Sequence, residues 1–293
     1  MLGEIRGEVR FKEPLSFHTS LRIGGPADIF IVPQDVEDIR LALSFAEREQ
    51  LSLDVIGGGN NLLVSDRGVR GVVLKLEGCL GRAEFNGEEA VAGAGVSLSA
   101  LIREAAALNL GGIECLVGVP ATVGGAVAMN AGTADGGIGD FISAVYFLYP
   151  DGTLGEFKPG AGSFSNRTFT APAGAVLIGA RLQLHRRPFA EIQRDIKQRL
   201  KQKKSTQPLA LASVGCVWKN PPGETASRLI EKVGLRGKRL NGAEISAKHA
   251  NFIVNRGGAA ATDIKALMQL TLDRVRNHFG ITLEPEMKTL GEI

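Results

Sequence analysis

The chain has 293 residues, of which 44% are hydrophobic and 22% are charged, and its net charge is +3 at pH 7. These totals exclude an intrinsically disordered chain and predict a globular protein of two or three compact units. The mild positive charge suits anionic small ligands, and one tryptophan with two tyrosines offers no stacking platform for single-stranded nucleic acid. We therefore expect no nucleic-acid partner.

The cysteines and the lack of long apolar segments indicate the cellular compartment in which we expect the protein. The three cysteines lie far apart without a C-x-x-C pair, so we expect neither a disulfide framework nor a metal site. The first residues, MLGEIRGEVRFKEP, mix charges without an apolar run, which predicts no secretory signal. No apolar stretch reaches the roughly 18 residues of a membrane span. We expect a cytoplasmic monomer with no membrane insertion.

The N-terminal part predicts alternating strands and helices. Residues 27–32 (ADIFIV) are typical of a strand, and Asp35 is expected to cap a helix whose apolar positions recur every 3.6 residues. A short strand at 53–56 runs into three glycines. Ser97 is expected to cap a second helix, with Gly111 just past its end. Further strands are predicted at 72–76, at 90–92 and between 145 and 184.

The sequence pattern changes at Arg187-Pro188 from short predicted strands to a long predicted helix. Proline is common at a helix start, and an apolar stripe at Ile192, Ile196 and Leu200 predicts a helix whose other face is basic. A second long helix is expected after Thr262. The sequence therefore predicts an α+β protein with a domain boundary near Arg187.

Glycine is over-represented, with 38 of 293 residues against a usual share of about 7%. The run at 57–59 follows a strand, so its amides could cradle a pyrophosphate, although an ordinary glycine turn explains it equally well. A Rossmann site is unexpected, because Leu62 stands where the third glycine of G-x-G-x-x-G belongs. The second run, 118–132, is either a surface for a large planar cofactor or a buried corner between strands.

Three motifs together carry a resemblance to a known family. They are TSLRIGGPA from Thr19, GGGNNLL from Gly57 and GVPATVGGAVAMNAG from Gly118. They resemble the FAD-binding PCMH-type domain of the vanillyl-alcohol oxidase superfamily and, within it, the shorter subtype of the UDP-N-acetylenolpyruvoylglucosamine reductase family. The resemblance covers about residues 17–291.

The resemblance implies a two-part FAD-binding domain over 1–187, split near residue 76. A smaller α+β substrate-binding domain would cover 188–280, and a segment at 281–293 would return to the active site. It also implies noncovalent FAD, NADPH as hydride donor and a UDP-sugar substrate. The residues that it places around the flavin are Gly57, Gly58, Gly59, Asn60, Asn61, Gly118, Val119, Pro120, Thr122, Gly124, Gly125, Ala126 and Asn130.

The same resemblance implies three catalytic residues. Cys216, in VGCVWKNP, corresponds to the serine or cysteine that donates a proton, and a thiol with an ordinary pKa of about 8.5 carries its proton at neutral pH. Composition alone favours a small buried hydrophobe instead. Glu286, in LEPEM, corresponds to the catalytic carboxylate. Arg167 corresponds to the arginine that binds the substrate carboxylate.

Other positions are implied to meet the substrate, or depart from the family pattern. Lys219, Asn220 and His249 could contact the uridine diphosphate or the sugar, as could the neighbouring Lys248 and Asn251. Asn166 stands where tyrosine is common, Ala121 replaces a glycine, Asn60 replaces a serine, and Trp218 replaces a phenylalanine.

The resemblance implies NADPH-dependent, FAD-mediated reduction of UDP-N-acetylglucosamine enolpyruvate to UDP-N-acetylmuramate, in peptidoglycan precursor synthesis. Two alternatives remain open at this point. An oxidase of the vanillyl-alcohol type would leave Cys216 and Glu286 without a role. A phosphate- or nucleic-acid-binding protein would use the basic helix face between Arg194 and Lys204 instead.

Overall fold

The computed structural model describes residues 2–133, 135–165 and 167–292, and has the predicted α+β class. The chain forms two compact units. Unit 1 comprises residues 1–11, 29–58 and 71–202, and unit 2 comprises 12–28, 59–70 and 203–293. These units are discontinuous, unlike the contiguous ranges expected from the sequence, because two N-terminal segments pack with the C-terminal part.

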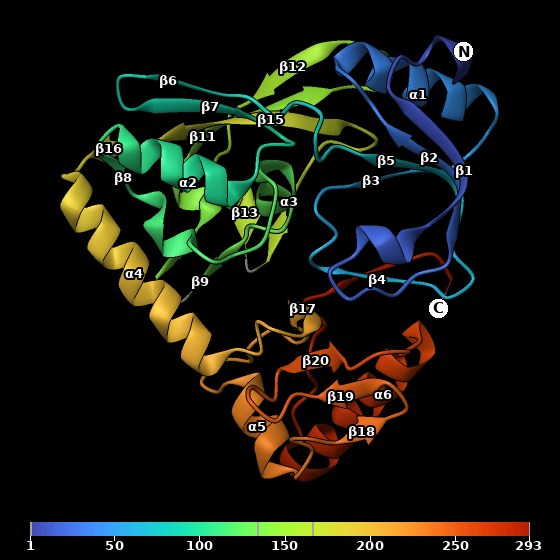
Figure 1. Ribbon diagram of the computed structural model, residues 1–293, viewed down its shortest axis with the longest axis vertical. Helices are drawn as coiled ribbons and strands as arrows, with labels where there is room; N and C mark the ends of the chain where they lie inside the picture. Colours follow the sequence, from blue (N-terminus) through green and yellow to red (C-terminus); the bar gives the residue numbers. More distant parts are fainter. Residues whose placement is uncertain (1, 134, 166, 293) are drawn as a thin grey trace. The chain divides into compact units, whose positions relative to one another are not determined.

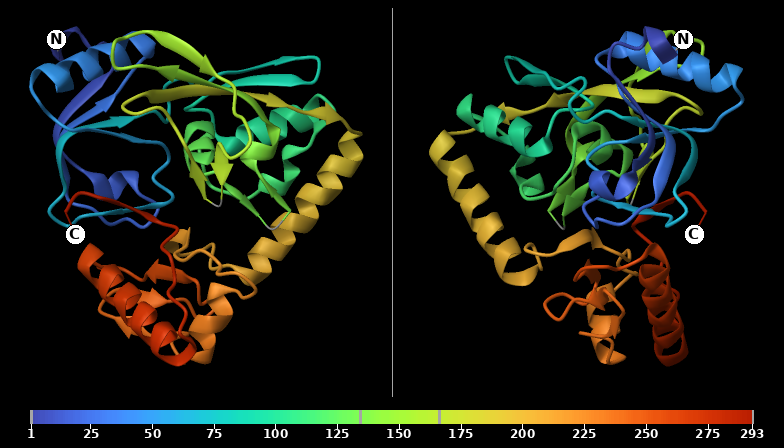
Figure 2. Two further views of the ribbon diagram at one scale, coloured as in Figure 1. Left: turned by 180° about the vertical axis from the view of Figure 1, so that it is seen from behind. Right: turned by 45° about the vertical axis from the view of Figure 1, so that its right-hand side comes forward.

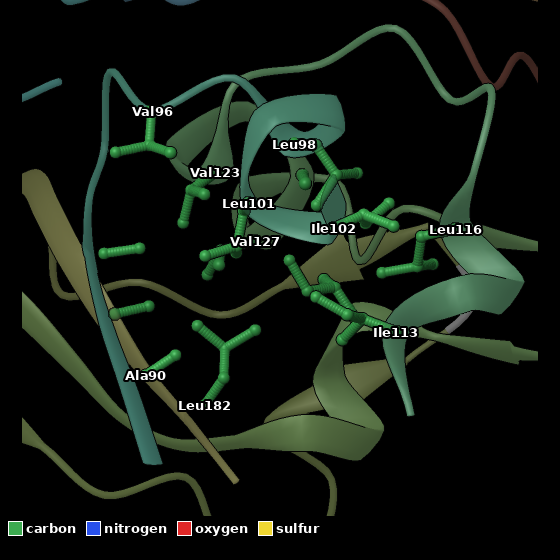
Figure 3. Packing of buried hydrophobic residues seen from close by; sticks show 14 of the residues in the cluster. Ala90, Val96, Leu98, Leu101, Ile102, Ile113, Leu116, Val123, Val127 and Leu182 are labelled. Atoms are coloured by element: carbon green, nitrogen blue, oxygen red, sulfur yellow. The ribbon is translucent and has the colours of Figure 1, made fainter. Parts of the chain in front are cut away.

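A five-stranded antiparallel sheet forms one layer of unit 1, in the order β12-β11-β15-β7-β6. Helices α2 and α3 lie together beneath it (Figure 1). Figure 3 shows Leu101 and Val127 from these helices facing Ala90 and Leu182 of the sheet, all of them buried in one core cluster. The bounds are β6 Ala83–Asn86, β7 Glu89–Gly93, β11 Ile142–Leu148, β12 Leu154–Phe157, β15 Val176–Gln183, α2 Leu98–Ala107 and α3 Val123–Ala128.

A second sheet has the order β1-β2-β5-β3, with helix α1 (Val36–Arg48) packed on it. Its strands are β1 Glu8–Pro14, β2 Pro26–Val32, β3 Leu53–Ile56 and β5 Val69–Lys75. The Asp35 side chain accepts hydrogen bonds from the backbone N–H groups of Glu37 and Asp38, so the predicted cap of α1 is confirmed. The helix buries Ile39 and Ala42 in a core shared with both sheets.

The long helix α4 and several short elements complete the description of unit 1. Helix α4 (Phe189–Thr206) begins after Pro188, as predicted, and Ile192 is its one residue described as buried. The short elements are η1 Leu2–Glu4, β8 Leu110–Gly111, η3 Ile113–Leu116, β9 Gly132–Thr133, β10 Gly136–Gly137, η4 Ile138–Phe141, β13 Phe164–Ser165, β14 Thr168–Phe169 and β16 His185–Arg186.

Unit 2 is built on a four-stranded antiparallel sheet in the order β17-β20-β19-β18, with helices α5 and α6 (Figure 2). The helices and the sheet share one buried core, which includes Leu229, Ile253 and Ile264. The bounds are η2 Leu15–His18, β4 Leu62–Val64, β17 Ala212–Cys216, α5 Ala226–Lys232, β18 Arg239–Leu240, β19 Ala243–Ile245, β20 Phe252–Asn255, α6 Ala261–Phe279 and β21 Lys288–Leu290.

Two contacts bind segment 59–70 into unit 2. Strand β4 pairs in parallel with β21, with Leu62 opposite Lys288. Asp66 caps α6 from a distant part of the chain, because its carboxylate accepts hydrogen bonds from the N–H groups of Ala261 (2.7 Å) and Thr262 (3.1 Å). The C-terminal segment and most of the first glycine motif therefore belong to the same unit.

Some local predictions differ from the structure. Helix α2 ends at Ala107, and Asn109, with φ of 58°, adopts the left-handed conformation that is common just past a helix end, whereas Gly111 was the residue expected there. Ser97 stands at the cap position, but its hydroxyl lies 2.9 Å from that of Ser99 and caps no amide of the described helix. Helices α3 and α5 were not expected. None of the described helices is both long and apolar enough to cross a membrane.

Candidate active site

The two glycine runs meet inside unit 1. Gly57 follows strand β3, and a Cβ atom at this position would lie 2.5 Å from the hydroxyl oxygen of Thr122. That hydroxyl accepts a hydrogen bond from the N–H of Gly125 (3.2 Å) and so caps helix α3. The first run can approach the second this closely only because residue 57 has no side chain.

The start of α3 is held against the segment before α2. The N–H of Gly124 donates to the carbonyl of Ala94 over 2.9 Å, and a Cβ atom on Gly124 would lie 2.8 Å from the Cβ of Ala94. The N–H of Val123 donates to the carbonyl of Val96 (2.8 Å). Glycine at 124 therefore brings the amide-rich end of this short helix next to residues 94–96, which connect β7 to α2.

A cavity of about 220 Å³ lies where these segments meet. Apart from Thr122, its side chains are apolar, and within the described residues the backbone N–H groups of Gly57 and Gly58 donate no hydrogen bond. Apolar walls suit a flat ring, and unpaired amides suit phosphate oxygens, so these residues fit FAD. The lining residues are Val55, Ile56, Gly57, Leu76, Ala94, Thr122, Gly124, Gly125, Ala128, Phe147, Phe169, Ala171, Ala175, Val176 and Leu177.

The rest of the first run lies in unit 2. Gly59 has φ of 63°, and a Cβ there would lie 1.9 Å from the carbonyl oxygen of His18, so no other residue fits. Asn60 follows in the turn before β4. The side-chain amide of Asn61 donates to the backbone carbonyl of Glu286 over 3.1 Å. Asn61, expected near the flavin, therefore also holds the segment that carries a predicted catalytic carboxylate.

The other expected flavin residues of the second run lie around the start of α3. Gly118 adopts φ of 73° after η3, and the N–H of Val119 donates to the carbonyl of Leu116 over 3.0 Å. Pro120 follows, and Ala126 is fully buried within α3. These residues shape the backbone entering the helix.

Arg167 lies at the turn of the β13–β14 hairpin in unit 1. Its φ of 60° is a left-handed conformation that non-glycine residues seldom adopt, and its guanidinium donates to the carbonyl of Gly132 over 2.9 Å. Asn130 supports the same hairpin, because its amide nitrogen donates to the carbonyl of Ser165 (2.9 Å) and its oxygen accepts from the N–H of Gly139 (3.1 Å). Asn166 lies outside the described residues.

Cys216 and Glu286 are brought together in unit 2. Cys216 ends strand β17 and is half-buried. The N–H of Glu286 donates to the carbonyl of Val217 over 2.8 Å, and the N–H of Lys219 donates to the carbonyl of Glu284 over 2.9 Å. The segment that carries the thiol and the segment that carries the carboxylate thus run side by side.

The expected substrate-binding residues surround this pair of segments. The Lys219 ammonium lies 3.5 Å from a carboxylate oxygen of Glu284, and Asn220 accepts from the N–H of Ala226 over 3.0 Å, at the start of α5. His249 packs edge-on against Phe252, with ring centroids 4.8 Å apart, and burial lowers the pKa of its imidazole. Its Nδ1 accepts a hydrogen bond from the backbone N–H of Asn251 over 3.3 Å, so Nε2 carries the hydrogen of the neutral ring.

The predicted residues thus form one group in each unit. Gly57, Thr122, Gly125, Asn130 and Arg167 lie in unit 1, whereas Gly59, Asn61, Cys216, Lys219 and Glu286 lie in unit 2. Among the described residues, no group of three or more His, Cys, Asp or Glu side chains could hold a metal ion. The sequence pattern missed the direct contact between the glycine runs and the link from Asn61 to Glu286, since neither leaves a local signal.

Two protein-family models match the chain. Residues 27–158 match an FAD-binding domain. Residues 207–290 match the C-terminal domain of UDP-N-acetylenolpyruvoylglucosamine reductase. The first match contains the cavity-lining glycines and the second contains Cys216 and Glu286.

Similar proteins extend the match over nearly the whole chain. A UDP-N-acetylenolpyruvoylglucosamine reductase of an Anaeromyxobacter species is 44% identical, over 98% of this chain and 90% of its own. A reductase of the same description from Symbiobacterium thermophilum is 40% identical, over 97% of this chain and 93% of its own. The crystal structure of the reductase from Thermus caldophilus superposes with a TM-score of 0.84 at 36% identity, over 98% of this chain and 100% of that one.

Proposed function

The chain belongs to the UDP-N-acetylenolpyruvoylglucosamine reductase family, and from this premise we propose how it reduces UDP-N-acetylglucosamine enolpyruvate to UDP-N-acetylmuramate for peptidoglycan synthesis. The enzyme is a flavin-dependent oxidoreductase with an FAD-binding domain. The observation that carries the proposal is the 2.8 Å hydrogen bond from the N–H of Glu286 to the carbonyl of Val217, next to Cys216. It supports a shared role for the thiol and the carboxylate.

We propose that FAD binds noncovalently along the two glycine runs and that NADPH supplies the electrons. The amides of Gly57 and Gly58, which bond to no other described residue, are available to the diphosphate, and the apolar cavity takes a flat ring of the cofactor. When bound, FAD would supply the hydride-transfer chemistry between the nicotinamide and the terminal vinyl carbon of the enolpyruvyl group. The helix cap made by Thr122 keeps the start of α3 in place against the ligand.

Hydride addition leaves an electron pair on the carbon that bears the ether oxygen and the carboxylate. Arg167 binds that substrate carboxylate through its guanidinium and stabilises the negative charge delocalised over it. The hairpin turn sets the backbone of Arg167, and the hydrogen bond to the carbonyl of Gly132 orients its guanidinium. Fixed donors of this kind stabilise developing charge without reorganising at the moment of reaction.

Cys216 completes the reduction by giving its thiol proton to that carbon, which forms the C–H bond of the D-lactyl ether. Two electrons and one hydrogen arrive as hydride and one proton arrives from sulfur, so the double bond becomes a single bond and a thiolate remains. The Glu286 carboxyl group assists in its protonated form, because it then donates a hydrogen bond to the enolate-like species alongside Arg167. The thiolate regains a proton from solvent before the next turnover.

Residues around the thiol bind the rest of the substrate. Lys219, Asn220 and His249 contact the uridine diphosphate or the sugar, and the neutral His249 offers its Nε2–H as a donor. We propose that the enzyme acts as a monomer in the cytoplasm. Gel filtration coupled to light scattering tests the monomer directly.

Product analysis tests the proposed function. The purified enzyme with FAD is incubated with NADPH and the UDP-linked enolpyruvyl sugar, and the products are examined by mass spectrometry. We expect a UDP-sugar heavier than the substrate by two hydrogen atoms, formed in one-to-one proportion with NADP⁺. NADPH oxidation without that product contradicts the proposed substrate. Release of FAD into the filtrate on denaturation checks that the flavin is noncovalent.

A further inference from the structure

Asn251 holds the segment beside Cys216 through two opposed hydrogen bonds. Its oxygen Oδ1 accepts from the backbone N–H of Trp218 over 2.9 Å, and its nitrogen Nδ2 donates to the carbonyl of the same residue over 2.8 Å. The backbone carbonyl of Asn251 also accepts from the N–H of Val217 (2.8 Å). The side chain of Asn251 therefore bonds to both the backbone N–H and the backbone carbonyl of Trp218, as a residue of a neighbouring strand would.

This contact extends a sheet beyond the point where its ladder ends. Strands β17 and β20 pair side by side up to Cys216 opposite Phe252, with an irregularity before Cys216 (Figure 1). The residues just before Phe252 form a turn, in which the N–H of Phe252 bonds to the carbonyl of His249 (2.9 Å). A turning backbone cannot continue the ladder. The amide of Asn251 takes its place.

The opposite edge of the same segment carries the catalytic carboxylate. Trp218 pairs with Pro285 in an isolated antiparallel bridge, and the N–H of Glu286 bonds to the carbonyl of Val217. The segment 216–219 therefore lies between Asn251 on one edge and residues 284–286 on the other. A shift of the Trp218 peptide away from Asn251 changes the spacing between Cys216 and Glu286.

Burial separates this role from substrate contact. Asn251 is 3% exposed, and both ends of its amide are already bonded to Trp218. A buried amide with both ends bonded is poorly placed to bind a ligand, whereas it is well suited to fix a backbone.

We propose that Asn251 is a positioning residue, which sets the geometry between the Cys216 thiol and the Glu286 carboxylate by holding the peptide of Trp218. The inference deepens the proposed function and rests on it. Asn251 acts only in the step that protonates the substrate. Reduction of the flavin by NADPH does not depend on it.

The variant Asn251→Asp tests this role through its own protonation. An ionised aspartate accepts from the N–H of Trp218, but its second oxygen faces the Trp218 carbonyl, so one bond becomes a repulsion. A protonated aspartate has the shape of asparagine and restores the donor. Burial and the facing carbonyl both oppose ionisation, so the pKa of this carboxyl should lie above its usual value of about 3.9.

The experiment separates the two half-reactions by stopped-flow absorbance. The variant is loaded with FAD near pH 5.5, where the protonated form is expected to fold as the wild type does, and is then mixed into buffers up to about pH 8. Reoxidation of the reduced flavin by the UDP-linked enolpyruvyl sugar is recorded within seconds, so slow unfolding does not interfere. Each rate is divided by the wild-type rate at the same pH.

We expect reoxidation to fall on the order of 100-fold at high pH, the loss typical of a misplacement of about 1 Å, and to recover as the pH falls. Flavin reduction by NADPH should match the wild type throughout. Asn255→Asp is the matched control, because Asn255 ends strand β20, which follows directly after Asn251, but bonds to Leu21 and Gly257 instead. This control should show no pH-dependent loss of reoxidation.

Three results overturn the inference. The first is an equal loss of rate in flavin reduction and flavin reoxidation, and the second is a loss of reoxidation rate in Asn251→Asp that does not change with pH. The third is a higher KM for the sugar with unchanged kcat, which indicates direct substrate contact. Failure of the proposed function is distinct, since the wild-type flavin itself would then not be reoxidised by the sugar.

Discussion

The backbone N–H of Glu286 donates to the carbonyl of Val217 over 2.8 Å, which joins a residue next to the thiol of Cys216 to a carboxylate near the end of the chain. The two residues belong to different strand-like segments, and Asn61 supports the second by bonding to the Glu286 carbonyl. This bond fixes the backbone that carries the thiol against the backbone that carries the carboxylate, which in the proposed reaction lets both groups act on the substrate without a conformational search.

Replacing the thiol should separate the half-reactions. In Cys216→Ala we expect NADPH to reduce the flavin at the wild-type rate, whereas reoxidation by the UDP-linked enolpyruvyl sugar falls by about 10²–10⁴, the usual contribution of a positioned acid. Stopped-flow absorbance measures both rates. Cys216→Ser is the control, because a hydroxyl retains a transferable proton and should retain more activity. Equal loss in both half-reactions contradicts the role of the thiol.

Replacing Arg167 with glycine should lower the activity of the enzyme without lowering its stability. Arg167→Gly removes the guanidinium, so kcat should fall by about 10²–10³, the cost of losing one charge-stabilising donor. Its Tm should not fall, because glycine accepts φ of 60° without the cost of about 1–3 kcal/mol that other residues bear there, and this gain offsets the lost bond to Gly132. Thermal melting and steady-state kinetics measure the two effects.

Arg167→Lys keeps the charge but loses the planar pair of donors, so its activity should fall between that of Arg167→Gly and the wild type. A large drop in Tm for the glycine variant, in step with the loss of activity, would indicate that Arg167 has a structural role only.

The variant Gly57→Ala tests the close contact between Gly57 of the first glycine run and Thr122 of the second. The new methyl group would lie 2.5 Å from the hydroxyl of Thr122, so one run must move, at a cost of about 1–3 kcal/mol. We expect weaker FAD retention, measured by fluorescence titration of the apoprotein. Gly160→Ala is the control, since no described atom beyond its chain neighbours lies within 4 Å of the place that its methyl group would take.

The double variant Gly57→Ala with Thr122→Ala should recover part of the FAD affinity. It removes the hydroxyl and leaves the Cβ of residue 122 at 3.6 Å, an ordinary contact. Additive losses in the double variant instead would show that the two runs do not act through this contact.

Asp38 should govern acid stability in unit 1. Burial alone would raise the pKa of its carboxyl, but N–H donors from Gln34, Arg6 and Gly7 outweigh burial and hold the pKa below its ordinary value. A lowered folded-state pKa stabilises the fold above the unfolded-state value of about 3.9, and that stability is lost as the pH falls through the folded-state pKa.

We therefore expect Asp38→Asn to lower Tm at neutral pH and to flatten the decline of Tm in acid. Melting curves across the acid range measure both effects. Glu47→Gln, exposed on the same helix, is the control. Parallel acid curves for Asp38→Asn and the wild type would contradict the role of Asp38.

Local signals predicted much of the fold. The strand at 53–56 and the cap at Asp35 agree with the structure, because short apolar runs and capping residues act through nearby backbone. Helix α3 was not predicted, since its two glycines oppose a helix. It forms because Thr122 caps it and because Gly124 packs closely on Ala94, and both are effects of tertiary structure.

The discontinuous units could not be predicted for a similar reason. The parallel pairing of β4 with β21 joins segments far apart in the chain, and no local pattern encodes a pairing of that range. The family motifs did indicate Cys216, Glu286 and Arg167 as candidates. The side chains that hold their segments became evident only from hydrogen bonds: Asn251 bonds to the backbone of Trp218, and Asn130 bonds to the arginine hairpin.

The most direct test of the account is the visible spectrum of the FAD-loaded enzyme during anaerobic addition of NADPH, followed by the UDP-linked enolpyruvyl sugar. We predict that the flavin absorbance bleaches with NADPH and returns fully with one equivalent of the sugar. A flavin that bleaches and stays reduced after the sugar is added would contradict the proposed reaction.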